Sequence, residues 1–198
     1  MNKDKQGWLP IISASMLFIF WIFFAVFLPM TEPYINWVMD NDWIWVNTLG
    51  FTGSTLGIFS LYSIYYTIDS RKNLEAIAMG LSVFGIAILT SILFFESFIL
   101  KGIALENESL IDLNAGFYAF VPFRLASLAG GMMFSAGMII LGIRMVQKKT
   151  FKRWSLLLLI IGCPLFGITI MPGNLRLLGV LLYSIAFIAI GVQMLKKE

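Results

Sequence analysis

Six long stretches without a charged residue constrain this chain more than any other feature of its sequence. They cover residues 6–31, 43–68, 76–95, 125–143, 154–175 and 177–195, and each has 19 to 26 residues. The next longest gap between charges, 113–123, has 11 residues. A helix needs roughly 20 apolar residues to cross the ~30 Å hydrocarbon core of a bilayer. The gap lengths therefore predict six membrane-spanning helices.

The composition favours lipid over water as the solvent of this chain. Of its 198 residues, 59% are hydrophobic and 13% are charged, whereas soluble domains carry about 25% charged residues. The stretches are continuously apolar and do not alternate as in a membrane β-barrel. We therefore expect one all-α domain over residues 1–198. The predicted helices are about 9–28, 46–66, 75–98, 122–145, 154–171 and 175–195.

The basic residues predict how the bundle is oriented. With a cytoplasmic N-terminus, 11 of the 14 lysines and arginines fall on the cytoplasmic side, and the others are Lys101, Arg124 and Arg176. Inner loops of membrane proteins carry an excess of such residues, so both termini should be cytoplasmic. The basic loop 144–153 should also bind anionic lipid. The net charge of +3 does not indicate nucleic-acid binding, because these charges flank the apolar stretches.

Small residues mark the faces on which helices should pack. The second and fourth stretches carry glycines at close spacing: Gly50, Gly53, Gly57, Gly130, Gly131 and Gly137. Thr48, Thr52 and Thr55 also recur at helical spacing in the second stretch. Lipid offers hydroxyls no partner, so this helix should lie inside the bundle, where packing is favoured over a polar conduit. In the fifth stretch, Pro164 cannot donate to the carbonyl of Ile160, which predicts a kink.

Aromatic and charged residues near the ends of the stretches suit the membrane interfaces and the helix ends. Tyr34, Trp37, Trp43 and Trp45 fall in the predicted outer loop, where aromatic rings with a polar edge favour the headgroup layer. Glu75 falls in the first turn of the third predicted helix, where a carboxylate complements the helix dipole.

Three ionisable residues indicate where a ligand site could lie. Glu96, Arg124 and Arg176 lie toward the outer ends of their helices. Charges at membrane depth are costly and suggest a function. Residues 76–95 and 125–143 already match one membrane thickness, however, which favours Glu96 and Arg124 as interfacial anchors or as a structural ion pair. The alternative is a small outer-facing pocket in which the arginines bind an anionic headgroup or a carboxylate.

Several classes of chemistry lack the residues they need. The chain has no histidine, which is the commonest metal ligand and general base. Cys163 is the single cysteine, so no intramolecular disulfide can form. HExxH, GxSxG and paired intramembrane carboxylates are absent. We therefore expect no catalytic residue, no metal and no cofactor.

Three functions remain open. The first is a non-catalytic helix bundle that binds or passes a small or lipid-like ligand through the outer pocket. The second is an accessory or assembly subunit, or a homo-oligomer, whose glycine-striped helices pack on a membrane partner. An intramembrane enzyme is the least favoured, since Glu96, external acids and tyrosines are the only acid–base groups on offer.

One family resemblance adds a location. The segment Phe134-Ser-Ala-Gly137, the basic loop ending at Arg153-Trp154 and the apolar run with Gly162 cover about a third of the chain. They resemble the C-terminal half of small six-helix bacterial membrane proteins that are grouped only as a domain of unknown function. The resemblance implies the cytoplasmic (inner) membrane of a bacterium and no particular activity.

Overall fold

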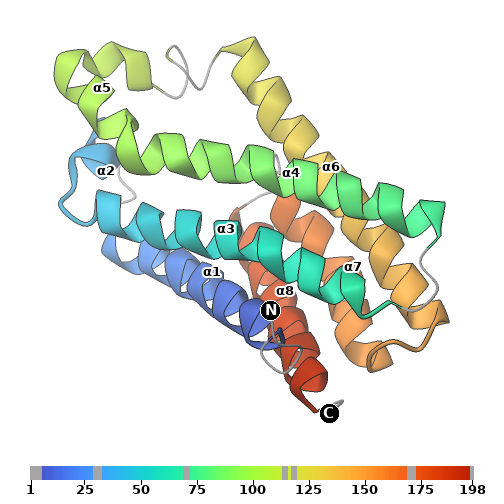
Figure 1. Ribbon diagram of the computed structural model, residues 1–198. Coiled ribbons are helices and arrows are strands. Elements are labelled where there is room, and N and C mark those ends of the chain that lie inside the picture. Colours follow the sequence, from blue (N-terminus) through green and yellow to red (C-terminus); the bar gives the residue numbers. More distant parts are fainter. Residues whose placement is uncertain are drawn as a thin grey trace.

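The computed structural model describes residues 6–28, 33–68, 72–112, 116, 120–168 and 173–196. Every regular element among them is helical, which confirms the all-α prediction (Figure 1). In chain order they are α1 (Trp8–Phe27), α2 (Ile35–Met39), α3 (Trp43–Tyr66), α4 (Asn73–Phe98), α5 (Leu100–Glu106), the short 3₁₀ helix η2 (Glu108–Ile111), α6 (Val121–Gln147), α7 (Arg153–Gly167) and α8 (Gly173–Leu195).

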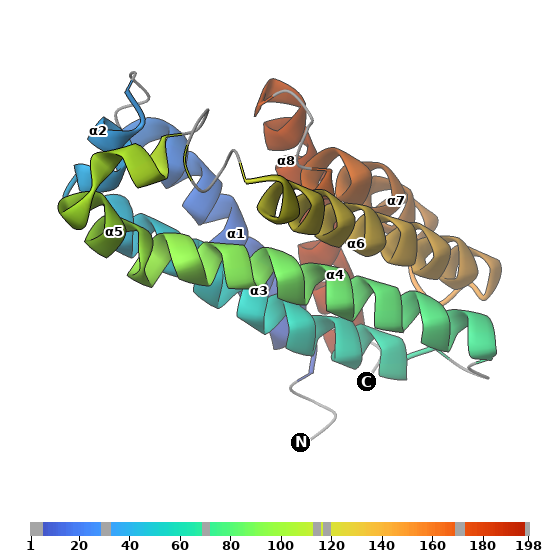
Figure 2. The ribbon, with the colours of Figure 1, turned by 90° about the horizontal axis from the view of Figure 1, so that it is seen from above.

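The six long helices form a closed ring in sequence order. α1 packs on α3, α3 on α4, α4 on α6, α6 on α7 and α7 on α8, and α8 packs back on α1. The start of α1 and the end of α8 consequently lie side by side, where Gly7 meets Gly191 (Figures 1 and 2). We call this end of the ring the terminal end and the other the distal end. α2, α5 and η2 lie at the distal end.

Glycines allow the helices of the ring to approach closely. A Cβ added to Gly131 would overlap the backbone of Gly167 in α7, and one added to Gly85 would overlap the backbone of Phe134 in α6. At each of the six glycines predicted to serve packing, an added Cβ would lie within 3.1 Å of a backbone or side-chain atom of a neighbouring helix. Gly80, in contrast, has nothing within 4 Å of an added Cβ. Backbone contacts of this kind are typical of helix packing in membranes.

Four helices are long and apolar enough to cross a membrane: α1, α4, α6 and, over its residues Asn174–Leu195, α8. The other two predicted spans do form helices, but each falls short in one respect. α7 has 15 residues and ends at Gly167, just after Pro164, whereas a helix to 171 was predicted; residues 169–171 lie outside the described part. α3 has 24 residues, and its polar and glycine residues lower its hydropathy.

The outer surface of the ring is rich in large apolar side chains. Phe59, Phe84, Met132 and Ile161 are each more than half exposed and come from α3, α4, α6 and α7. A soluble protein rarely exposes large apolar side chains around its whole circumference. The surface therefore suits a lipid environment.

The distal end is closed by an aromatic cluster. Trp43 is fully buried, donates Nε1–H to the carbonyl oxygen of Glu96 at 2.8 Å, and packs edge to face against Tyr34. The prediction of headgroup contact is therefore wrong for Trp43 and Tyr34, because α2 and α5 cover them. Trp45 is 38% exposed and is available to an interface.

The threonines of α3 satisfy their hydroxyls within their own helix. Thr48, Thr52 and Thr55 each donate to the carbonyl oxygen four residues back, at 2.7 to 2.8 Å. This bonding explains how the hydroxyls are tolerated in an apolar helix, and it fits packing better than a polar conduit.

Candidate functional site

A cavity of about 400 Å³ lies inside the distal half of the ring. Its volume falls in the range of small-molecule pockets, which is about 300–1,000 Å³. Every long helix contributes to its wall. One lining residue from each, in chain order, is Trp21, Ser54, Glu96, Phe123, Phe166 and Arg176. The ring as a whole therefore builds this site.

Two hydrogen-bond donors in the cavity wall lack an acceptor. The Nε atom of Arg176 and the Nε1 atom of Trp21 are buried, and neither has a hydrogen-bond partner in the described part of the chain. The Arg176 guanidinium lies over the Trp21 ring, with 4.9 Å between its Cζ atom and the ring centroid. This cation–π contact positions the guanidinium. Buried donors in native proteins are almost always bonded to protein or ordered water, so these two donors need an acceptor.

Glu96 gives the same cavity a negative charge. Its half-buried side chain lines the wall and interacts electrostatically with Arg176. The backbone of Glu96 is held by the hydrogen bond from Trp43, which joins the end of α4 to the start of α3. The site thus combines a cation with a carboxylate in a largely apolar cavity.

Apolar side chains form the inner part of the cavity. Leu17 of α1, Ile86 and Leu89 of α4, and Phe166 of α7 line it toward the middle of the ring. Ser127 adds a hydroxyl near the start of α6. The wall therefore matches a molecule with one polar end and one apolar end.

The three site residues proposed from the sequence take different positions. Glu96 and Arg176 share the cavity, whereas Arg124 is exposed in the first turn of α6 and does not line it. Trp21 was not proposed, because an indole inside an apolar stretch gives no charge signal. Its role depends on Arg176, which lies 155 positions later in the sequence.

A separate ionic cluster joins α4 to α6 at the terminal end. The side chain of Glu75 is fully buried, with Oε1 at 3.0 Å from Arg144 Nε and 2.8 Å from Lys148 Nζ. Its other oxygen accepts a hydrogen bond from the backbone N–H of Lys72 at 3.2 Å. Helix position alone predicted only the effect of Glu75 on the dipole of α4. The two cations extend its role to holding two helices together.

Comparisons with protein-family models, with curated proteins and with solved structures give no match for this chain. The resemblance to small six-helix bacterial proteins therefore stays a prediction.

Proposed function

We propose that this protein is a multi-pass protein of the bacterial cytoplasmic membrane, in which all six long helices span the bilayer and both termini are cytoplasmic. The four long apolar helices and the apolar outer surface of the ring support this proposal. α3 packs between α1 and α4, and α7 packs between α6 and α8. Because these contacts cover part of each helix, a lower hydropathy is enough to keep it in the bilayer. The basic loop between α6 and α7 would then lie at the cytoplasmic side.

We further propose that the cavity binds, or passes, a small amphiphile that carries a carboxylate or a phosphate. The observation that carries this proposal is the pair of unpartnered buried donors, on Trp21 and Arg176, in one cavity. An anionic oxygen there would accept from both, and charge-assisted hydrogen bonds are the stronger kind. The apolar part of the ligand would lie along Leu17, Ile86 and Phe166.

The accessory-subunit hypothesis receives less support from the packing. It requires glycine faces that are open to a partner, but the predicted packing glycines of α3 and α6 already face helices of the same ring. An intramembrane enzyme would need acid–base groups that converge in the cavity, and Glu96 is the one carboxylate among its lining residues. Ligand binding therefore remains the best-supported function.

The proposal can be tested with chemically simple probes. Purified protein in a non-ionic detergent is titrated with laurate, dodecyl phosphate and dodecanol, and binding is measured by native mass spectrometry. We expect the two anions to bind more tightly than dodecanol, and Arg176→Gln to weaken anion binding at least tenfold. Arg124→Gln removes the same charge at the same end of the ring, outside the cavity, and should change binding less than twofold.

Other outcomes would contradict the ligand site. Equal affinity for laurate and dodecanol would show that no anion is recognised. A loss of folded protein in Glu96→Arg and in Arg176→Glu, with rescue in the charge-swapped double variant, would assign the two residues to a structural pair. Equal losses in Arg124→Gln and Arg176→Gln would point to general electrostatics at this end.

A further inference from the structure

The cavity in the distal half of the ring becomes more buried toward the middle of the bundle. Near the distal end its lining is partly exposed, as at Trp21, Glu96 and Arg176. Toward the middle its lining is buried, and Leu17 and Ile86 expose only 2% and 3% of their surface. A ligand that enters at the distal end therefore meets these two side chains last. We call Leu17 and Ile86 the floor of the cavity.

The floor is closed by contacts with α3. A Cβ added to Gly57 would lie 3.0 Å from Ile86 Cδ1 and 3.3 Å from Ser13 Oγ, and one added to Gly53 would lie 3.1 Å from Leu17 Cγ. Ser13 Oγ also donates to Gly53 O at 2.8 Å, which joins α1 to α3 behind the floor. No space for a further side chain remains there, so a ligand could pass the floor only if a side chain moved.

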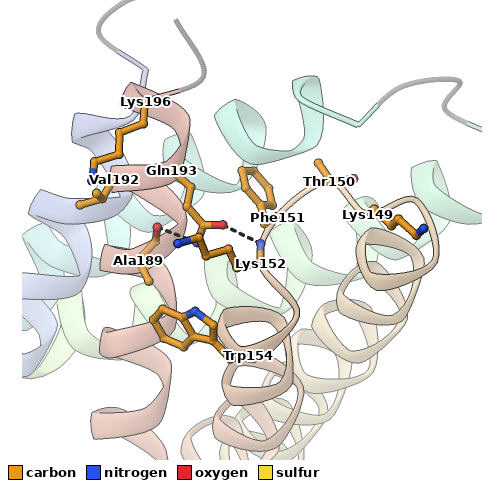
Figure 3. A pocket seen from close by; sticks show the side chains of 9 residues that line it. All are labelled: Lys149, Thr150, Phe151, Lys152, Trp154, Ala189, Val192, Gln193 and Lys196. Atoms are coloured by element: carbon orange, nitrogen blue, oxygen red, sulfur yellow. Dashed lines mark hydrogen bonds between the residues drawn. The ribbon is translucent and has the colours of Figure 1, made fainter.

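The terminal end of the ring gives this cavity no second opening within the described part of the chain. Gln193 of α8 accepts a hydrogen bond from the backbone N–H of Lys152 at 2.6 Å, which ties α8 to the loop between α6 and α7 (Figure 3). The surface hollow of about 590 Å³ that Figure 3 shows at this end shares no lining residue with the cavity. At the same end, Glu75 and its two cations tie α4 to α6. The cavity is thus a pocket that ends at its floor.

The depth of the pocket limits the length of a bound chain. Glu96 near the opening and Ile86 in the floor are ten residues apart in α4, which corresponds to about 15 Å at the rise of an α-helix. A fully extended polypeptide gains about 3.6 Å over the three bonds of a residue, so an extended hydrocarbon chain gains about 1.2 Å per bond. A chain of about twelve bonds therefore reaches from the opening to the floor.

The volume of the pocket gives a similar limit. A water molecule takes up about 30 Å³ of the liquid and a methylene group has a similar size, so a cavity of about 400 Å³ holds about 13 such groups. A carboxylate accounts for about three of them and leaves about ten for the chain. Depth and volume thus agree on a chain of about ten to twelve carbons.

We propose that the pocket selects its ligand by chain length, and that Ile86 sets the limit at about ten to twelve carbons. This inference rests on the function proposed above, because Trp21 and Arg176 must bind the polar end for the length to matter. A longer chain would lift its anionic group away from these two donors or displace Ile86. The ligand class is therefore a medium-chain fatty acid or alkyl phosphate, and a phospholipid with two long chains does not fit.

The test is a chain-length series with the full-length protein in a non-ionic detergent. Native mass spectrometry measures competition among equimolar decanoate, laurate, myristate and palmitate. Each methylene group that cannot be buried forfeits about fourfold in affinity, so decanoate and laurate should each bind at least tenfold more than palmitate. Micelles take up the longer acids more strongly, but this uptake is the same for every variant and cancels when their profiles are compared.

Two small substitutions should move the limit in opposite directions. Ile86→Val removes the Cδ1 atom from the floor and should raise the ratio of myristate to laurate about fourfold. Gly57→Ala adds a methyl group 3.0 Å from that atom, which pushes Ile86 into the pocket, and should lower the ratio of laurate to decanoate about fourfold. Ile77→Val is the matched control, since Ile77 also belongs to α4 but is 59% exposed outside the pocket, and it should keep the wild-type profile.

The same titrations separate the length limit from the anion site. Preference for laurate over dodecanol, with the wild-type chain-length profile in both Ile86→Val and Gly57→Ala, would overturn the limit and leave the anion site standing. Equal binding of laurate and dodecanol would overturn both. A shift in Ile77→Val as large as that in Ile86→Val would also overturn the limit. Melting temperatures verify that the variants are folded, and either of the two shifts tests the limit by itself.

Discussion

Replacing Glu75 by glutamine removes the charge that holds α4 to α6 while it keeps the shape of the side chain. The carboxylate of Glu75 is fully buried, whereas Arg144 and Lys148 keep 25% and 20% of their side-chain surface exposed. The amide can still accept from the backbone N–H of Lys72 and from Arg144. What is lost is the negative charge shared by two cations at 3.0 and 2.8 Å.

The size of the effect follows from the intermediate burial of this cluster. Removing one partner of a buried ion pair costs about 3–5 kcal/mol, and removing one from an exposed pair costs about 1 kcal/mol or less. The two cations of this cluster remain partly hydrated at one end of the bundle, which places Glu75→Gln between these limits. We expect a loss of about 2 kcal/mol in the free energy of unfolding, which is roughly a 30-fold change in the equilibrium constant.

Unfolding in mixed micelles of a mild detergent and dodecyl sulfate, followed by circular dichroism, measures this loss. Glu106→Gln is the matched control, since Glu106 is an exposed carboxylate and should change stability by less than 0.5 kcal/mol, an order-of-magnitude expectation for surface sites. A double-mutant cycle with Lys148→Gln should give a coupling of about 1 kcal/mol. The reasoning fails if Glu75→Gln is no more destabilising than Glu106→Gln.

Four further substitutions test other features of the structure. Gly131→Ala should destabilise by about 2 kcal/mol, because its methyl group meets the backbone of α7; Gly80→Ala, where the methyl group meets nothing, should be neutral or stabilising in the same unfolding assay. Trp43→Phe loses its hydrogen bond to a carbonyl oxygen of α4 and should cost about 1 kcal/mol, and an unchanged midpoint would contradict this. Lys149→Gly should stabilise by about 1 kcal/mol by relieving the positive φ, and an unchanged midpoint in the same assay would contradict this.

The positions of the long helices were predictable because they depend on local information. The absence of charge over a membrane thickness is visible in a single stretch, and most observed bounds lie within three residues of the predicted ones. α7 is the exception among the helix ends, since it stops at Gly167 soon after Pro164. Trp43 shows a different limit, because whether a tryptophan faces lipid or protein depends on whether another segment, here α5, covers it.

The candidate site was predictable only in part, because it depends on contacts between distant segments. A search for charges in apolar surroundings found Glu96 and Arg176, which line the cavity. The same search cannot tell a residue that faces the interior from one that faces outward, and Arg124 is exposed. It also cannot find Trp21, whose relevance comes from its contact with Arg176.

The return of α8 to α1 has a consequence for how the chain assembles during synthesis. Every other neighbouring pair in the ring is complete as soon as the next long helix has been made, but α1 must wait for α8. Until then the face that includes Gly7, which meets Gly191 in the finished protein, has no partner. If ribosomes stalled before α8 is made, the contact between α1 and α8 would therefore be absent. The cavity would then lack the part of its wall that α8 supplies.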